Sequence, residues 1–337
     1  METGVFLKKI LKNLREVFMK KYVVAIILIV AMVLPVFAEG QAESGPKKVD
    51  VIAFTCQDLG NPFFKLMGEA VKDAAADLYP GAKVLIESGE NDINKQSTQI
   101  DDFISSGVDI LILNACDSEG IGPAVARARD AGMVVVASDV TAKNADAFVT
   151  SNNTKAGALV AQYIVDRLNG KGNVIAIVGD PVSATLDRYD GMKEVFAANP
   201  GIILLSEDQN GKGRRELSMN LCADLLTKFD DVDAIWGCND PTALGAQLAV
   251  VQAGRQDGLF IVGVDGSPDA AADMALDGSI FAASSAQDPY YMAYHGVEMA
   301  KDIIDGKDIE REQLVDVSLI TQAEVKAGYT GWDVPAR

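Results

Sequence analysis

Short apolar runs alternate with amphipathic segments along most of this chain. The runs are apolar at consecutive positions, and each following segment has apolar residues every three or four positions, as in a helix with one buried face. This alternation predicts parallel sheets covered on both faces. It starts again near residue 147, which favours two doubly wound halves over one large sheet. The expected strands are residues 49–55, 83–87, 109–113, 133–137, 147–150, 174–178, 202–206, 234–236, 259–264, 280–283 and 314–320. The expected helices are residues 62–78, 93–105, 120–131, 154–168, 184–198, 214–228, 242–253, 268–276 and 289–304.

The first residues have the pattern of an export signal. Two lysines precede an apolar run at residues 22–37, and the run ends in small residues at Ala38. We predict that residues 1–38 form a signal peptide region with cleavage after Ala38. Met19 is an alternative initiator, because residues 1–18 do not belong to the pattern. The run is short for a membrane span, so we expect a periplasmic or other extracytoplasmic protein.

Composition excludes several functions. The 337 residues leave room for about two domains, and a net charge of −18 disfavours nucleic acid as a partner. Because His295 is the only histidine, histidine-rich metal sites and histidine-dependent nucleophilic catalysis are disfavoured. The phosphate-binding glycine motifs are missing as well. We therefore expect no enzyme, no metal and no cofactor. The four cysteines have no diagnostic spacing, and whether Cys56 pairs with Cys116 stays open.

Polar and aromatic side chains recur where the expected strands end. The carboxyl ends of parallel strands meet at one edge of a sheet, so these side chains should converge on a cleft. Amides, carboxylates and a guanidinium can bind hydroxyls, and an aromatic ring can cover the C–H face of a sugar. The candidate ligand-binding residues are Asn61, Phe63, Phe64, Asn114, Asp139, Ser151, Arg188, Asn239, Asp265 and Gln287.

Each of these positions also has a structural explanation. Asn61 precedes a proline and suits a helix N-cap, and Asp240 does the same, so we expect Asp240 to be structural. Arg188 could instead pair with a neighbouring acid at the surface. Phe63 and Phe64 should diverge on the first turn of a helix, which makes a shared core position unexpected for both. The recurrence at successive strand ends is the stronger signal.

On these motifs the chain resembles the periplasmic sugar-binding proteins of the ribose/galactose type, closest to the ribose-binding branch. The resemblance covers nearly all of residues 49–320. The motifs are Asn61-Pro62-Phe63-Phe64, Asn114 in L-N-A-C-D-S, Asp139, Ser151, Arg188 in D-R-Y-D-G-M, Asn239-Asp240, Asp265 in V-G-V-D-G-S-P-D, and Gln287. In that family the matched Asn, Phe, Asp, Arg and Gln positions line the ligand cleft, which implies the same role here. Ribose binders have an arginine where this chain has Val140, and residues 208–214 offer no aromatic. A different pentose, a hexose, a polyol or another small polar ligand is therefore open.

The resemblance implies an α/β fold of the type I periplasmic binding protein kind, with two doubly wound parallel-sheet lobes joined by a three-segment hinge. The N-terminal lobe would be residues 49–151 plus 288–316, and the C-terminal lobe residues 152–287 plus 317–337. Hinge closure would bury the ligand.

The implied function is capture of a sugar or sugar-like polyol by a monomer that delivers it to the membrane permease of an ABC transporter. One alternative is a ligand sensor that docks on a chemoreceptor or histidine-kinase ectodomain. The other is the core of a lactose-repressor-type regulator, which the signal sequence in place of a helix-turn-helix disfavours.

Overall fold

The computed structural model describes residues 48–332 and the single residue Arg15. The predicted signal peptide region and its cleavage site lie outside the described residues, apart from Arg15. The described residues 48–332 belong to one compact unit. Two six-stranded sheets build this unit, with strand orders β11-β5-β4-β3-β1-β2 and β12-β10-β9-β8-β6-β7. The predicted alternation of strands and helices is confirmed.

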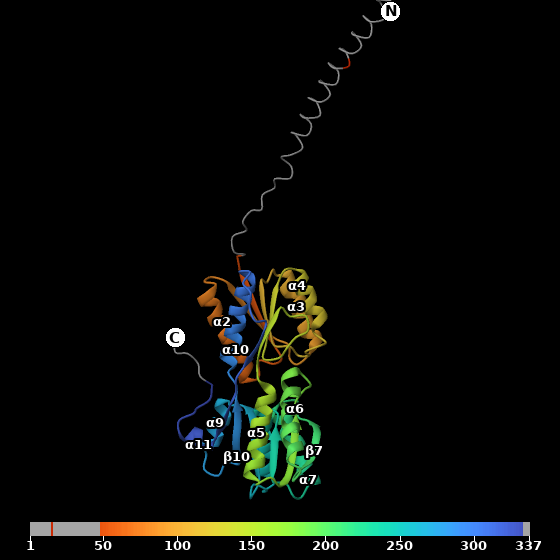
Figure 1. Cartoon of the computed structure of the whole chain (residues 1–337), viewed down its shortest axis with the longest axis vertical. Helices are drawn as coiled ribbons and strands as arrows, with labels where there is room; N and C mark the ends of the chain where they lie inside the picture. Colours follow the sequence, from red (N-terminus) through yellow and green to blue (C-terminus); the bar gives the residue numbers. More distant parts are fainter. Residues whose placement is uncertain (1–14, 16–47, 333–337) are drawn as a thin grey trace, which may run out of the picture. The chain divides into compact units, whose positions relative to one another are not determined.

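The first lobe contains the first sheet and four helices (Figure 1). Its elements are β1 (Val51–Cys56), α2 (Pro62–Leu78), β2 (Lys83–Ser88), α3 (Ile93–Ser105), β3 (Ile110–Leu113), α4 (Gly122–Asp130), β4 (Val134–Ser138), β5 (Ala147–Ser151), α10 (Pro289–Ile304) and β11 (Glu312–Val315). Alternate residues of β1 serve opposite faces, because successive side chains of a strand point in opposite directions. Ile52 and Phe54 belong to the core under α2 and α10, and Ala53 belongs to the core under α3 and α4.

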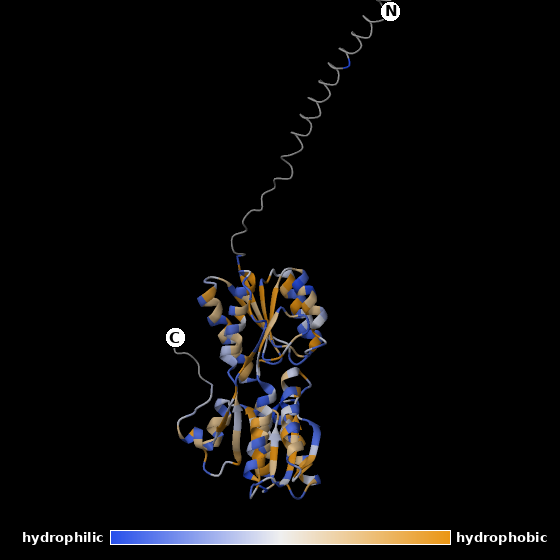
Figure 2. Ribbon diagram, in the orientation of Figure 1, coloured by the Kyte–Doolittle hydropathy of each residue, from blue (hydrophilic) through white to orange (hydrophobic). Residues whose placement is uncertain are grey.

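The second lobe repeats this arrangement. Its elements are α5 (Asn153–Arg167), β6 (Gly172–Val178), α6 (Ser183–Ala198), β7 (Ile202–Asn210), α7 (Arg215–Lys228), β8 (Ala234–Gly237), α8 (Asp240–Gln252), β9 (Phe260–Asp265), α9 (Pro268–Met274), β10 (Phe281–Ala286), β12 (Ser318–Thr321) and α11 (Gln322–Lys326). Val174 and Ala176 of β6 pack under α5 and α6, whereas Ile175 and Ile177 pack under α7 and α8. In Figure 2 the strands between the helices are mostly apolar, and polar residues gather on the outer helix faces.

Between residues 48 and 332 the chain passes from one sheet to the other three times: from β5 to α5, from β10 to α10, and from β11 to β12. The last crossing corrects the prediction of one strand at residues 314–320, because this segment is divided between the two sheets. β12 also departs from the predicted parallel arrangement, since it pairs antiparallel with β10. The chain leaves β11 at the edge of the first sheet that faces the second lobe and enters the second sheet directly. β12 therefore runs away from the first lobe, whereas β10 runs toward it.

Two further observations concern the described part of the chain as a whole. None of its helices is long and apolar enough to cross a membrane. Cys56, Cys116, Cys222 and Cys238 are all free thiols, so the open question of a Cys56–Cys116 pair is answered in favour of two separate thiols.

Candidate functional site

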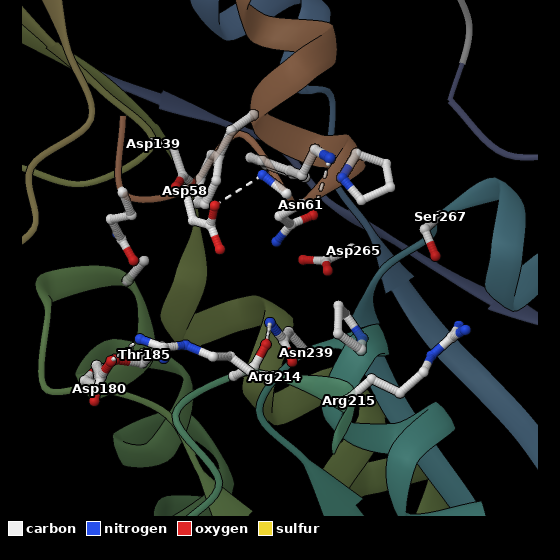
Figure 3. A pocket seen from close by; sticks show the side chains of 18 of the residues that line it. Asp58, Asn61, Asp139, Asp180, Thr185, Arg214, Arg215, Asn239, Asp265 and Ser267 are labelled. Atoms are coloured by element: carbon white, nitrogen blue, oxygen red, sulfur yellow. Dashed lines mark hydrogen bonds and ion pairs between the residues drawn. The ribbon is translucent and has the colours of Figure 1, made fainter. Parts of the chain in front are cut away.

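A cavity of about 540 Å³ has walls from both lobes. The carboxyl ends of the parallel strands supply much of the wall, as expected for sheets of this kind. Eight of the ten predicted residues line it: Asn61, Phe63, Phe64, Asp139, Arg188, Asn239, Asp265 and Gln287. Figure 3 shows labelled polar side chains of the two lobes facing each other across the cavity, with those of the first lobe being Asp58, Asn61 and Asp139.

The start of α2 forms one wall. Asn61 is the N-cap of α2, and its Oδ1 accepts a hydrogen bond from the Phe63 amide at 3.0 Å. The structural and functional explanations of Asn61 therefore hold together, because a cap at the cavity edge is also part of the wall. Phe63 and Phe64 are both buried in the same hydrophobic core, contrary to the expectation that they diverge. Their rings meet edge to face at 5.6 Å, so one ring packs against the other.

Asp139 is a buried carboxylate at the end of β4. Its backbone has a φ of 68°, in the left-handed region that asparagine and aspartate tolerate best. Its Oδ2 accepts a hydrogen bond from Asn114 Nδ2 at 2.9 Å, while its Oδ1 has no partner. Burial raises the pKa of Asp139 to about 6, although Arg188 and the Asn114 hydrogen bond act in the opposite direction. Asp139 therefore presents an unpartnered acceptor.

Asn114 and Ser151 are the two predicted residues that the cavity wall does not include. The Asn114 amide is engaged behind the wall, because it donates to Asp139 and its Oδ1 accepts from the Gln57 amide at 3.2 Å. The Ser151 hydroxyl lies 3.5 Å from Met292 Sδ, in the direction of α10. Both residues follow or end a strand, but their side chains support neighbouring groups instead of facing the cavity.

Arg188 is buried and does not form the surface ion pair that was the alternative. Its Nε donates to Asn153 Oδ1 at 2.7 Å, and one terminal nitrogen donates to the Cys238 carbonyl at 3.1 Å. That nitrogen also lies 3.8 Å from Asp265 Oδ1. The backbone of α6 at Arg188 is close to α5, since a Cβ on Gly157 would lie 1.9 Å from the Arg188 carbonyl oxygen. A glycine is therefore required where the two helices cross.

A buried polar relay joins Asp139 to Arg188 through the β5–α5 crossing. Thr150 Oγ1 donates to the Asp139 carbonyl at 2.5 Å, Asn153 Nδ2 donates to Thr150 Oγ1 at 3.1 Å, and Asn153 Oδ1 accepts from Arg188. Each group is buried, so these hydrogen bonds do not compete with bulk water. The relay fixes a residue of each lobe relative to one crossing segment. Sequence reasoning missed Asn153, whose pattern is that of a helix start alone.

Asp265 and Gln287 lie together at the ends of β9 and β10. Gln287 Nε2 donates to Asp265 Oδ1 at 2.8 Å, and the Gln287 amide donates to the Asp265 carbonyl at 3.0 Å. Gln287 Oε1 is buried without a partner. Burial first, and then the nearby carboxylates of Asp240 and Asp139, hold the pKa of Asp265 well above its usual range, while Arg188 lowers it.

Asn239 lines the cavity and Asp240 does not. Asn239 is the actual N-cap of α8, since its Oδ1 accepts from the Thr242 amide at 3.0 Å, and its Nδ2 donates to the Gly213 carbonyl. Asp240 begins the helix, and its carboxylate accepts from the Ser284 hydroxyl at 2.6 Å and from the amide of Ser267. These two bonds give Asp240 a structural role.

Carboxyl groups outnumber cations in the buried part of the site. Asp139, Asp240 and Asp265 are buried, and Arg188 is the one buried cation among the described residues. Burial is the largest cause of the raised pKa of each of these three carboxyls. Val140, beside Asp139 on the wall, adds no cation. The site therefore favours a ligand that donates hydrogen bonds.

Several wall residues were not predicted from the sequence. They are Gln57, Asp58, Asn91, Asp180, Thr185, Lys212, Arg214, Arg215, Ser267, Asp269 and Trp332, among others. Arg214 lies 3.7 Å from Asp180, and Arg215 lies 3.2 Å from Asp269, so these charges are mostly paired at the rim. Gln57 and Asp58 follow β1 directly, so the expectation that polar residues at strand ends line the cleft applies to them as well. Among the described residues, no group of three His, Cys, Asp or Glu side chains could hold a metal ion.

Two α/β lobes with an intervening cavity of hydroxyl-binding groups define the solute-binding class of periplasmic protein. The chain belongs to the periplasmic binding protein domain family, whose model matches residues 52–308. The predicted fold class, a type I periplasmic binding protein with two lobes, is confirmed.

Relatives of known function share most of the chain. The ribose import binding protein RbsB of Bacillus subtilis is 31% identical over 284 residues, which cover 83% of this chain and 90% of that protein. A xylitol-binding protein of Mycolicibacterium smegmatis is 30% identical over 243 residues, covering 71% of this chain and 68% of that protein. A solved solute-binding protein of an ABC transporter from Bacillus halodurans, with bound myo-inositol, superposes with a TM-score of 0.76. It is 27% identical, and the match covers 85% of this chain and 98% of that one.

Proposed function

We propose that this protein captures a sugar or sugar-like polyol in the interlobe cavity and delivers it to the membrane permease of an ABC transporter. The observation that carries the proposal is the set of groups on the wall. Asp139 Oδ1 and Gln287 Oε1 are buried acceptors without partners, and Arg188 is a buried donor beside them. A polyhydroxylated ligand supplies donors to the first two and acceptors to the third.

The aromatic rings at the start of α2 complement this polar set. Phe63 and Phe64 offer apolar surface on the wall next to the Asn61 amide. A sugar needs both kinds of contact, because its hydroxyls surround C–H faces. Two relatives are named for binding ribose and xylitol, and a related structure contains bound myo-inositol. These ligands support a small polyhydroxylated compound as the class of ligand for this protein.

Binding would be coupled to hinge closure. The three crossing segments are the connections between the lobes along the described chain, and Gln287 belongs to one of them. We propose the lobes as residues 49–151 plus 288–316 and 152–287 plus 317–337. A ligand held by Asp139 on one lobe and by Arg188 on the other favours the closed arrangement by its additional contacts. We also propose export by cleavage after Ala38 and a monomeric state.

Thermal unfolding against a ligand panel tests the proposal. The purified protein is first unfolded and refolded to remove carried ligand, and the panel contains pentoses, hexoses, linear and cyclic polyols, amino acids and nucleosides. A ligand at about 100 times its dissociation constant adds roughly 2.7 kcal/mol to the free energy of unfolding, which raises the melting temperature by several degrees.

A selective rise with one sugar or polyol supports the proposal and identifies the ligand. The sugar assignment is contradicted if only amino acids or nucleosides raise the melting temperature. It is also contradicted if no ligand raises the melting temperature of protein that is shown to be folded and free of carried ligand. Docking on a chemoreceptor or histidine-kinase ectodomain uses the same cavity and stays a prediction, tested by ligand-dependent pull-down on such ectodomains.

A further inference from the structure

The segment after α11 returns to the cavity. Tyr329 Oη donates a hydrogen bond to the Gly266 carbonyl at 2.6 Å, and Trp332 Nε1 donates to the Asp265 carbonyl at 2.8 Å. Gly331 has a φ of 117°, and a Cβ at this position would lie 2.7 Å from Pro268. The segment is therefore fixed to the end of β9, the following loop and the start of α9 by two side-chain hydrogen bonds and one close backbone approach.

Trp332 lines the cavity. It meets Phe63 edge to face, with ring centroids 5.5 Å apart and an interplanar angle of 81°. Phe63 belongs to α2 of the first lobe, and Asp265, which accepts the indole hydrogen bond, ends β9 of the second. One side chain thus contacts wall residues from both lobes.

Trp332 also supplies what the second lobe otherwise lacks. The three aromatic residues on the described wall are Phe63, Phe64 and Trp332, and both phenylalanines come from the first lobe. Elsewhere the second lobe offers mainly polar and charged residues to the cavity, including Lys212, Arg214 and others. A tail that only packed on the surface would not need its ring on this wall beside Phe63.

Building on the proposed function, we propose that Trp332 is a ligand-contacting residue that covers a C–H face of the ligand and selects cyclic over linear polyols. A ring sugar or cyclic polyol presents a rigid, flat C–H face to an indole. A linear polyol of the same size has no fixed face and loses more conformational freedom when it is ordered against one. The hydrogen bond from Nε1 to the Asp265 carbonyl holds the indole in place before the ligand arrives.

Binding measurements on the refolded protein test the selectivity. The probes are two pairs of equal carbon number, myo-inositol with sorbitol and D-ribose with ribitol. Trp332→Ala should weaken binding of the preferred cyclic member by roughly three- to tenfold, while the affinity for its linear partner changes less. Trp332→Phe keeps a ring on the wall and should restore most of the affinity for the cyclic member.

Tryptophan fluorescence gives a second readout that does not depend on the alanine variant folding. The chain has two tryptophans, and Trp236 is fully buried in the core of the second lobe. The ligand-induced change in emission should persist in Trp236→Phe and disappear in Trp332→Phe. If the wild-type protein binds a cyclic probe but its emission change does not depend on Trp332, or folded Trp332→Ala retains full affinity and selectivity, this inference is overturned while the proposed function stands. If wild-type protein binds no sugar or polyol at all, the proposed function fails first.

Discussion

Replacing Asp139 by asparagine should make the ligand-free protein more stable and its ligand binding weaker. Asparagine has nearly the same shape and tolerates the left-handed backbone at this position, where φ is 68°. Its amide oxygen can still accept the hydrogen bond from Asn114. The substitution therefore removes a buried charge while leaving the packing in place.

The size of the effect follows from the pKa of Asp139, which burial raises from 3.8 to about 6. A shift of roughly two units corresponds to about 3 kcal/mol of unfolding free energy, because the unfolded chain ionises more readily than the folded one. The pKa of Asp139 is higher in the folded chain than in the unfolded chain, so its bound proton stabilises the folded state at low pH. This stabilisation is lost as the pH rises through about 6. Asp139→Asn should gain about 3 kcal/mol over wild type near pH 7.5 and only about half of this near pH 5.

Urea unfolding of refolded, ligand-free protein at these two pH values measures the difference. Glu119→Gln is the matched control, because it removes one negative charge from an exposed ion pair with Lys143 and should change stability by less than about 1 kcal/mol. The charge of Asp139 raises the pKa of Asp265. The difference in unfolding free energy between the two proteins at one pH therefore includes a contribution from Asp265, which is smaller than that of Asp139 itself.

Ligand binding should change in the opposite direction. The unpartnered Asp139 Oδ1 becomes an amide donor or a neutral acceptor, and a hydrogen bond to a charged group contributes about 1.5–3 kcal/mol. We expect a loss of roughly ten- to a hundredfold in affinity by calorimetric titration. A destabilising buried charge at Asp139 is excluded if Asp139→Asn is no more stable than wild type near pH 7.5, or if the stability difference is the same at both pH values.

Three further substitutions test how the site is supported. Arg188→Met leaves the buried carboxylates without their cation, so binding should weaken by about 2–5 kcal/mol, which is roughly thirtyfold or more, and the melting temperature should fall. Unchanged affinity in titration would exclude Arg188 from the site. Asn153→Ala removes the acceptor for Arg188 Nε without touching the cavity wall, and titration should show a roughly three- to tenfold loss of affinity; a loss of stability with normal affinity would speak against the relay. Gly157→Ala forces α5 away from the Arg188 carbonyl and should lower the unfolding free energy by about 1–3 kcal/mol in urea. Gly296→Ala is its control, since its nearest atoms would be 3.6 Å away and stability should not fall.

The fold class and the edge of the sheets where the site lies could both be predicted from the amino-acid sequence. Consecutive apolar runs alternating with amphipathic helices define a covered parallel sheet, because periodicity is a local property of the chain. The expectation that polar residues at strand ends line the cleft then predicted Asp139, Asp265 and Gln287, which all line the cavity. It failed for Asn114 and Ser151, because position at a strand end does not fix the direction of a side chain.

Which groups act together, and in which ionisation state, depends on how the folded chain packs. The raised pKa of Asp139 comes from burial in the folded chain, and Arg188 is oriented by Asn153, a residue with an ordinary helix-start pattern. Trp332 meets Phe63 across almost the whole length of the described chain, and no local pattern connects them. The antiparallel direction of β12 likewise depends on a crossing between the sheets. These features depend on contacts between residues that are far apart in the sequence. The periodicity of a sequence is local and does not predict such contacts.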